Sequence, residues 1–412
     1  MNFKQKPKDF QILFLDMNSF FASIEQQVQP PLRGRPIGIT PYCGNTGCII
    51  SPSREAKICG VKTGNSVGQA KSICPGIKIV EARPALYLIY HRELKKVIAD
   101  SSPFYQPQSV DEFSIELSPS EQNFRRVEAA SRQIKQAIRE RVGDFLTCSV
   151  GAGPNKFLAK MAAEKIKPDG FFVVTLGGLK KFYADLGDLT EISGINVQME
   201  KHLRRFNINT PLQFYEKNLA ELVKILNHWG RLWYFRLRGW EVDDYVLRTQ
   251  NIGHSHVLAP QRRQRCGAES TLKKLIFKVG YRLRKKDCCA GGVSILVKFM
   301  DRTVFAKSRR VGNFCDNFTL TKNVFNLLQD CQWRTKPILV AVSVFNLTKN
   351  LNSYQISIFP EIEKLKKASV ALDELNDKFG AETIYPASIH QAKLAAPDRI
   401  PFGQPRYDIR YQ

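Results

Sequence analysis

The chain has 412 residues, and its 62 lysine and arginine side chains outnumber 38 acidic ones, giving a formal charge of +24. This length predicts several domains, and 43% hydrophobic residues exclude a wholly disordered chain. The charge predicts a polyanionic partner, nucleic acid first and an acidic membrane surface second. Ribosomal and general RNA-binding proteins share this composition, so it indicates a partner but no activity.

The cysteines and the apolar runs bear on the compartment. Ten cysteines occur without a CxxC pair, the nearest neighbours being Cys288 and Cys289. With only six histidines, this argues against a zinc site and for reduced thiols. No apolar run is long enough to span a bilayer, and residues 1–10 lack a signal-peptide core. We therefore expect a cytoplasmic protein with no membrane partner.

The first part of the chain alternates between strand and helix patterns. The apolar run Phe10–Leu15 predicts a buried strand that ends at Asp16, followed by a helix over residues 19–27. Glycines and prolines crowd residues 30–76, which predicts a small, turn-rich insertion. The pattern indicates a mostly antiparallel or mixed sheet of open strand order. Further strands are predicted at residues 77–80, 110–117, 145–150 and 171–174, and helices at 85–100, 124–142 and 155–165.

The second part of the chain predicts two more domains and a tail. Residues 175–246 are mainly helical in pattern, and the polar stretch that follows, to residue 267, suits a linker. From residue 268 a helix precedes apolar strand runs at 293–299 and 338–345, which predicts an α+β domain. The end of the chain predicts one helix near 363–379 and a loosely ordered, proline-rich terminus. The fold class is therefore α+β with several domains.

Three carboxylates stand at predicted strand ends: Asp16, Asp111 and Glu112. Adjacent strand residues point to opposite faces, so Asp111 and Glu112 can share a site only at a bent or terminal position. Oxygen ligands without histidine or thiolate suit Mg²⁺. Two such ions about 3.5–4 Å apart can activate a 3′-hydroxyl and stabilise a leaving pyrophosphate. The alternative is that each acid is an ordinary strand-end or helix-capping residue.

The spacing of two motifs favours the site over that alternative. The segment 16–23, DMNSFFAS, resembles the first motif of the Y-family DNA polymerases, and Ser109–Glu112 resembles their second acidic motif at its usual separation. The resemblance implies two bound Mg²⁺ ions, for which Mn²⁺ can substitute. The implied metal ligands are Asp16, Asp111, Glu112 and the backbone carbonyl of Met17.

The paired aromatic residues of the first motif have two readings. Phe21 falls where the family places its steric gate, a bulky ring that leaves no space for a ribose 2′-hydroxyl. Alternatively, Phe20 and Phe21 are both core residues of the first helix. We expect Phe20 to be the core residue of the two, and the resemblance implies that both border the nucleotide.

The segment 54–64 resembles the fingers motif of the same family. The resemblance implies that Lys57 holds the triphosphate, whereas a solvated basic surface is the alternative. Arg54 stands where many family members carry tyrosine. A guanidinium group binds phosphate well, so Arg54 is kept as a weaker nucleotide-binding candidate.

A second lysine is implied by the palm signature, which residues 149–160 and 167–170 resemble. There Lys167, restrained by the adjacent Pro168, would reach the nucleotide phosphates. Lys156 and Lys160 are expected to be general charge or to lie near the DNA.

Two segments resemble DNA-binding parts of the family. Residues 192–196, ISGIN, sit where the family has a helix-hairpin-helix turn, in which backbone N–H groups bind phosphates. The run 261–286 holds ten basic residues opposed only by Glu269, which fits a domain that follows the duplex backbone. A charge run on a solvated surface is the alternative. The candidate DNA contacts are Gly194, Arg262, Arg263, Arg265, Lys273 and Lys274.

The peptide Gln355–Phe359 is similar to the segment by which bacterial polymerases bind the sliding clamp. There Ile358 and Phe359 would fill an apolar pocket while Gln355 fixes the orientation. The alternative is a half-buried strand with Ile356 and Ile358 on one face. Residues 371–380 resemble the tail of the polymerase V catalytic-subunit branch, which indicates a bacterial chain.

The resemblance covers essentially the whole chain and implies a right-hand polymerase. It implies a DNA-directed DNA polymerase of low fidelity, acting in translesion synthesis and the SOS response on primer-template DNA and a dNTP, and we expect a monomer. The alternatives are a non-catalytic scaffold that binds DNA and the clamp, and a metal-dependent nuclease. The expected divisions are palm 1–35 and 78–174, fingers 36–77, thumb 175–246, linker 247–267, little finger 268–350 and tail 351–412.

Overall fold

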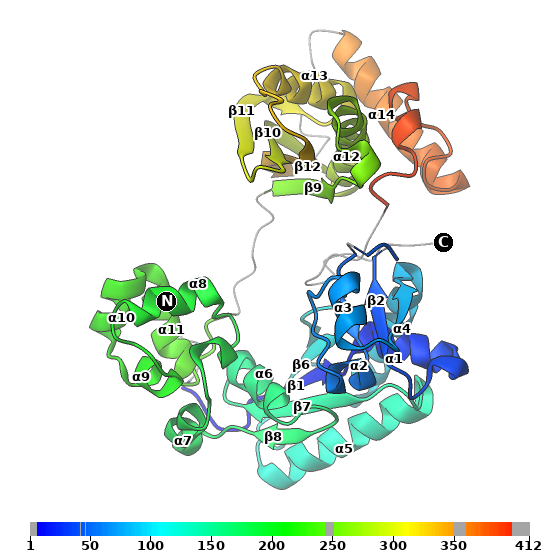
Figure 1. Cartoon of the computed structure of the whole chain (residues 1–412). Helices are drawn as coiled ribbons and strands as arrows, with labels where there is room; N and C mark the ends of the chain where they lie inside the picture. The colour runs from blue at the N-terminus through cyan, green and yellow to red at the C-terminus, as the bar shows by residue number, and fades with distance from the viewer. Residues whose placement is uncertain (1–5, 42, 46, 244–250, 350–359, 398–412) are drawn as a thin grey trace. The chain divides into compact units, whose positions relative to one another are not determined.

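The computed structural model describes residues 6–41, 43–45, 47–243, 251–349 and 360–397 (Figure 1). The chain divides into two compact units at residues 245 and 246. Each unit has its own buried hydrophobic core. Along the described chain, no helix is long and apolar enough to cross a membrane.

The first unit is built on a five-stranded sheet of order β5-β6-β1-β7-β8. All neighbouring strands are antiparallel except β7 and β8, which are parallel. The prediction of a mostly antiparallel sheet is therefore confirmed, and the strand order is now defined. The strands are β1 (Ile12–Met17), β5 (Tyr105–Pro107), β6 (Glu112–Glu116), β7 (Cys148–Gly153) and β8 (Phe171–Val173).

Both faces of β1 are buried, against different helices. Its odd-numbered residues join the main core with α1 (Phe20–Val28), α4 (Pro84–Ser101) and α5 (Phe124–Arg141). Ile12 and Phe14, on the other face, pack on α6 (Lys156–Lys165). Because strand side chains alternate, Asp16 projects on the α6 side of the sheet.

The close packing of α6 on β7 depends on a glycine. A Cβ atom at Gly151 would lie 2.1 Å from the carbonyl oxygen of Ala159 and 2.2 Å from the backbone nitrogen of Ala163. No other residue fits there without moving the helix. This contact brings the side chains of α6 over the end of β1 at which Asp16 lies.

A smaller sheet of order β3-β2-β4 carries α2 (Arg54–Ile58) and α3 (Val67–Ile73). It contains β2 (Ile37–Thr40), β3 (Ser51–Pro52) and β4 (Lys78–Glu81), with β4 parallel to β2. The strand predicted at residues 77–80 therefore joins this smaller sheet and not the five-stranded one. The strand pattern was recognised correctly, but a pattern does not reveal which sheet a strand joins.

The helical prediction for the next segment is confirmed, within the residues described. Five short helices share one core with Phe157 and Leu158 of α6, which ties them to the larger sheet. They are α7 (Leu179–Ala184), α8 (Val197–Arg204), α9 (Pro211–Glu216), α10 (Leu219–Leu226) and α11 (His228–Leu237).

The second unit contains a four-stranded sheet of order β11-β10-β12-β9. The linker prediction was wrong over 251–267, because Asn251–Val257 form β9 on the edge of this sheet and α12 begins at Arg265. Only Ile252 of β9 is buried, so the strand reads as polar. The remaining elements are α12 (Arg265–Lys285), β10 (Cys288–Phe299), β11 (Val304–Phe314), α13 (Asn317–Leu328) and β12 (Pro337–Lys349).

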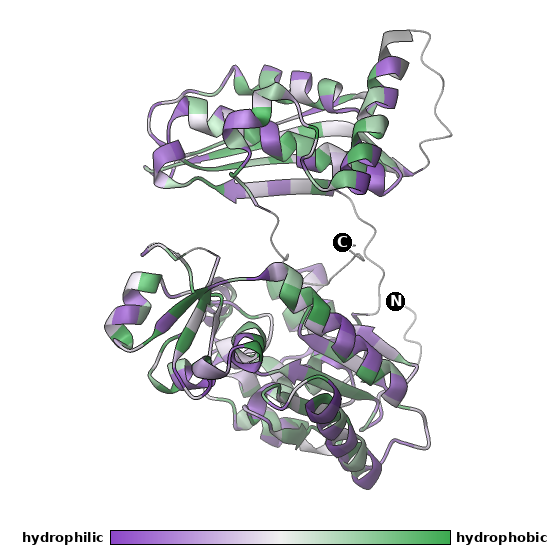
Figure 2. Ribbon diagram, turned by 90° about the vertical axis from the view of Figure 1, so that its right-hand side faces the viewer, coloured by the Kyte–Doolittle hydropathy of each residue, from purple (hydrophilic) through white to green (hydrophobic). Residues whose placement is uncertain are grey.

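The expectation of a loosely ordered end was also wrong for residues 380–397. After α14 (Pro360–Phe379), the short helix η6 (Ala387–Ala392) packs along α12. Figure 2 shows the hydrophobic positions concentrated between helices and strands within each unit. The C-terminal segment therefore completes the second unit by covering α12.

Covering α12 buries three of its basic side chains, which corrects the DNA-binding prediction for Lys274. The Lys274 ammonium group is paired with Glu382, 2.8 Å away. Lys278 donates a hydrogen bond to the carbonyl oxygen of Ala396, 2.5 Å away. A charged group buried in such pairs is unavailable to a phosphate. The sequence concealed this because the partners lie about a hundred residues further along the chain.

Replacing Arg284 with alanine is expected to destabilise the second unit by about 3 kcal/mol, the scale for breaking a buried ion pair. Arg284 binds Asp373 through two hydrogen bonds of 2.6 and 2.9 Å, with side chains only 3% and 14% exposed. The change leaves the Asp373 carboxylate without its partner. Urea unfolding measures the loss. The matched control is Arg310→Ala on exposed β11, for which we expect less than about 0.5 kcal/mol; equal losses would contradict the assignment.

Candidate active site

The predicted carboxylates meet in one cavity of about 550 Å³ in the first unit. The cavity is bordered by the large sheet, by α1 and α6 and by the smaller sheet. Its lining includes Asp16, Met17, Phe20, Phe21, Lys57, Ser109, Asp111, Glu112, Glu164 and Lys167. Residues from four separate motifs of the sequence therefore border a single space.

Strand register brings two of the acids together. Asp16 of β1 lies directly opposite Glu112 of β6 in the antiparallel pair. Such cross-strand neighbours have Cβ atoms about 4.5–5.5 Å apart on the same face. Asp111 comes just before β6, at the terminal position the sequence required, and its carbonyl accepts a hydrogen bond of 3.0 Å from the Met17 amide. The bend therefore lets neighbouring acids serve one site.

The backbone bends at Asp111, and contacts from α4 support this bend. The His91 ring stacks on Phe113, with centroids 5.4 Å apart, and its Nδ1 lies 2.8 Å from the Val110 carbonyl oxygen. Since a carbonyl only accepts, Nδ1 carries the proton. Ser109 donates a hydrogen bond of 2.5 Å to the Asp111 carboxylate. These contacts fix the backbone on both sides of Asp111.

Two lysines bind the carboxylates directly. The Lys167 ammonium group lies 2.7 Å from Asp16 Oδ2, and that of Lys160 lies 2.6 Å from Glu112 Oε1. Lys160, which was expected to be general charge or DNA-proximal, is thus paired with a carboxylate of the site.

Burial shapes the charge of this cluster. Burial raises the pKa values of Asp111, Glu112 and Glu164. Burial alone would lower the pKa of Lys160, but the Glu112 carboxylate outweighs it and raises that pKa. A nearby cation stabilises the ionised form of such a partly buried carboxyl group. The cavity therefore favours cationic partners.

The donor set is chemically suited to a hard divalent cation. It consists of carboxylate and carbonyl oxygens, which Mg²⁺ prefers, and the two ammonium groups already show where cations lie against Asp16 and Glu112. Among the described residues, however, no three acidic, histidine or cysteine side chains are gathered in a ready metal-binding arrangement. In this structure one carboxylate oxygen each of Asp16 and Glu112 is paired with a lysine.

Both aromatic residues of the first motif are buried, with 3% of Phe20 and 6% of Phe21 exposed. Phe21 also lines the cavity and stacks on Tyr87 of α4, with ring centroids 4.4 Å apart and an interplanar angle of 14°. The Tyr87 hydroxyl donates a 2.9 Å hydrogen bond to Glu25, one helical turn beyond Phe21 on α1. Tyr87 therefore holds Phe21 at the cavity wall.

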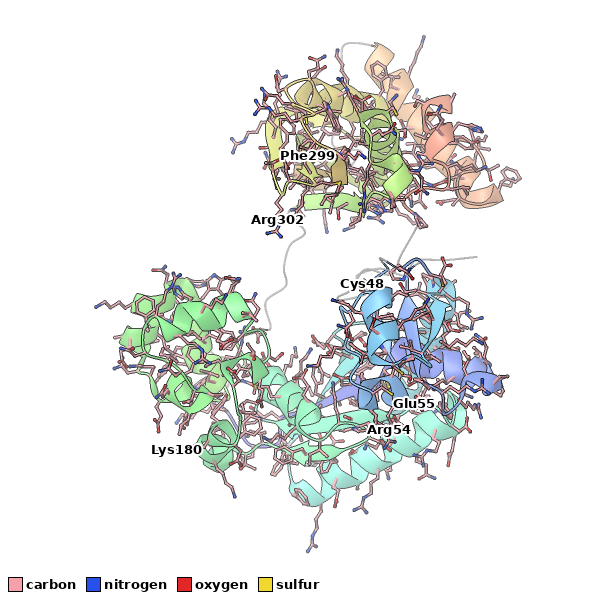
Figure 3. All side chains as sticks on the ribbon, in the orientation of Figure 1. Cys48, Arg54, Glu55, Lys180, Phe299 and Arg302 are labelled. Carbon is pink, nitrogen blue, oxygen red and sulfur yellow. The ribbon has the colours of Figure 1, made fainter. Side chains whose placement is uncertain are left out.

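The two candidates on α2 differ in their positions. The helix begins after Ser53, whose hydroxyl accepts the Ala56 amide hydrogen bond at 3.3 Å. Both candidate side chains are exposed, but Lys57 lines the cavity, where desolvation by the surrounding protein together with the Lys167 charge lowers its pKa. Arg54, labelled in Figure 3, is exposed and does not belong to the cavity lining. The structure thus brings Lys57, and not Arg54, to the carboxylates.

Comparison with known proteins agrees with this geometry. Residues 15–164 match the impB/mucB/samB family, and residues 249–358 match the C-terminal domain of that family. The chain belongs to this family of Y-family DNA polymerases.

Two curated relatives are similar over most of their length. A DNA polymerase IV of Moorella thermoacetica is 31% identical over 92% of this chain and 96% of its own. A DNA polymerase IV of Oceanobacillus iheyensis is 30% identical over 90% of each chain. The solved structure of a Y-family DNA polymerase chimera covers 82% of this chain and 99% of its own with a TM-score of 0.71; at 24% identity it supports the fold alone.

In this polymerase the helix-hairpin-helix candidate has suitable backbone geometry. Gly194 adopts φ +92°, a left-handed conformation, and a Cβ there would also approach the Trp233 ring at 3.5 Å. Asn196 then caps α8 by accepting hydrogen bonds from Gln198 and Met199. The contact with DNA stays a prediction.

The other basic candidates already have local contacts. Arg262 and Arg263 donate to the carbonyl oxygens of Gln391 and Leu258, and Arg265 pairs with Glu269 at 2.8 Å. Lys273 lies over the Phe325 ring, 5.5 Å from its centroid. Sequence reasoning missed a further exposed basic group on β11, formed by Lys307, Arg309 and Arg310, of which Lys307 pairs with Asp330.

The predicted clamp peptide, with Gln355, Ile358 and Phe359, lies outside the residues that the structure describes. It follows the end of β12 at Lys349 and precedes the start of α14 at Pro360. Its role therefore stays a prediction from the sequence.

Proposed function

We propose that this chain extends primers with low fidelity past damaged template bases, by nucleotidyl transfer with two metal ions in the 550 Å³ cavity. The supporting observation is that one cavity is lined by three carboxylates, by the candidate gate residue Phe21 and by two lysines that can bind phosphates, Lys57 and Lys167. The carboxylates are Asp16, Asp111 and Glu112.

Each group has a distinct part in the proposed reaction. The carboxylates and the Met17 carbonyl would hold the ions, which when bound would activate the primer 3′-hydroxyl and neutralise the leaving pyrophosphate. Lys57 and Lys167 would bind the triphosphate, because their ammonium groups line the same cavity. Phe21 would pack beneath the deoxyribose and exclude a 2′-hydroxyl.

The proposed duplex contacts lie in both units. Exposed Arg309 and Arg310 on β11 offer charge for phosphates, and Gly194 would place backbone N–H groups against the primer-template. Binding to a sliding clamp through Gln355–Phe359 is proposed on the sequence alone. That the protein acts as a monomer is likewise proposed on the sequence alone.

Primer extension on a labelled primer-template with Mg²⁺ tests the proposal, on an undamaged template and on one with an abasic site. We expect short, template-directed products that pass the lesion and require the metal. A primer that shortens would favour the nuclease. A protein that binds DNA without adding a nucleotide would favour the non-catalytic scaffold.

Replacing Lys57 with alanine is expected to raise KM for the dNTP by roughly 10-fold, the loss of one charge-assisted phosphate contact of about 1.5 kcal/mol. Lys57 lines the cavity, whereas exposed Lys62, five residues on, does not. Steady-state kinetics with Lys62→Ala as the matched control measures the difference. Equal values of KM in the two variants would place the triphosphate elsewhere.

A further inference from the structure

Two cysteines meet where the helices of the smaller sheet end. Cys59 is the C-cap of α2 and Cys74 is the C-cap of α3. The residues next to the two cysteines are in contact range, since a Cβ atom at Gly60 would lie 3.6 Å from the Ile73 side chain. The Cys59 side chain lies near enough to Cys74 to contribute to the raised pKa of the Cys74 thiol. These thiols are therefore neighbours in space, although fifteen positions apart in the sequence.

The two thiols differ in their access to solvent. Cys59 is exposed, whereas Cys74 is 5% exposed and packs in the core of this sheet beside Ala70 and Ile77. Burial raises the pKa of the Cys74 thiol, so it stays protonated at neutral pH. Because oxidants react with accessible thiolates, Cys59 meets the oxidant first and Cys74 is placed to react with the product.

We propose that Cys59 and Cys74 form an oxidation site that closes into a reversible disulfide on exposure to a peroxide. In the first step, the Cys59 thiol is oxidised by hydrogen peroxide to a sulfenic acid, and one water is released. In the second step, the Cys74 sulfur attacks the Cys59 sulfur, forms the S–S bond and releases a second water. A dithiol reductant reverses the reaction and restores both thiols.

A disulfide between Cys59 and Cys74 would affect the helix that carries Lys57. A disulfide would join the end of α2 to the end of α3, and α2 carries Lys57, which lines the cavity. Oxidation would therefore fix the helix that presents Lys57. The oxidation site itself does not depend on the proposed polymerase mechanism.

The chain contains a matched control pair. Cys289 likewise contributes to the raised pKa of the Cys315 thiol, so these two cysteines are also neighbours, but their side chains are only 0% and 6% exposed. They differ from the first pair in lacking an accessible member. Cys266 supplies the opposite control, since it is exposed on α12. Proximity and exposure can thus be separated within one protein.

The test oxidises the reduced, full-length protein with hydrogen peroxide, alkylates the remaining thiols and identifies tryptic peptides by mass spectrometry without reduction. We expect the peptides 58–62 and 72–78 to appear linked and to separate on treatment with dithiothreitol. Cys289 and Cys315 should stay alkylated and unlinked.

Variants establish the order of the two steps. In Cys74→Ser, Cys59 should accumulate as a sulfenic acid that dimedone traps, whereas in Cys59→Ser the Cys74 thiol should stay reduced. Labelling of Cys266 confirms that the peroxide dose suffices. Full alkylation of Cys74 in a wild-type sample whose Cys59 is oxidised would overturn the proposal, as would linkage of Cys59 to any other cysteine.

Discussion

Replacing Glu112 with alanine is expected to lower the rate of primer extension by about 10³-fold or more, the scale for losing a group that stabilises transition-state charge. Glu112 faces Asp16 across the paired strands β1 and β6, and its carboxylate lines the cavity. The change also leaves the Lys160 ammonium group without its partner at 2.6 Å. Single-turnover extension at saturating dNTP measures the chemical step.

The matched control is Glu116→Ala. Glu116 lies on the same strand and the same face, but is exposed at the far end, opposite Ile12. It should extend primers like the wild type. Binding to primer-template should be retained in both variants, because Glu112 does not contribute positive charge. An active Glu112→Ala variant would contradict the proposed metal site, and an inactive Glu116→Ala variant would indicate a folding defect instead.

The carboxylate site could be predicted because its residues are local motifs. Asp16 ends an apolar run and Asp111 begins another, and each position is visible without knowledge of the fold. Their convergence depends on β1 and β6 being neighbours, which the pattern left open. The role of Lys160 could not be predicted from its motif, since it follows from the packing of α6 across the same face of the sheet.

The basic residues could not be assigned to a DNA-binding surface from the sequence alone. The run of ten basic residues in 261–286 was taken as a DNA-binding face, but Arg284 and Lys274 are buried against Asp373 and Glu382. Counting charges within a window cannot reveal acids that lie about a hundred residues away. The exposed basic residues of β11, at positions 307–310, lie outside that run, on a polar edge strand that the apolar pattern did not predict.

The polar stretch read as a linker illustrates the same effect for strands. In β9 only Ile252 is buried, so residues 251–257 show no apolar alternation strong enough to predict a strand. These residues form a strand because they pair with β12 through backbone hydrogen bonds, which do not depend on side-chain type. An edge strand with a solvated face is thus invisible to hydrophobic periodicity.

Replacing Phe21 with alanine is expected to raise the relative use of ribonucleotides by roughly 10²-fold, since a pocket that sterically excludes one hydroxyl discriminates on about that scale. Phe21 lines the cavity and stacks on Tyr87. Its removal would open space where the proposed deoxyribose lies. The measured quantity is the ratio of kcat/KM for a dNTP to that for the matching rNTP. This ratio is independent of the fraction of folded enzyme.

Two further variants decide which ring is the gate. Tyr87→Phe keeps the ring that stacks on Phe21 and removes only the hydroxyl bonded to Glu25, so it should leave the ratio within about 3-fold of the wild type. Phe20→Leu alters the neighbouring ring, which also borders the cavity. Relaxed sugar selection in Phe20→Leu, with unchanged selection in Phe21→Ala, would assign the gate to Phe20. Relaxation in Phe21→Ala alone would show that the stacked ring of Phe21 excludes the 2′-hydroxyl.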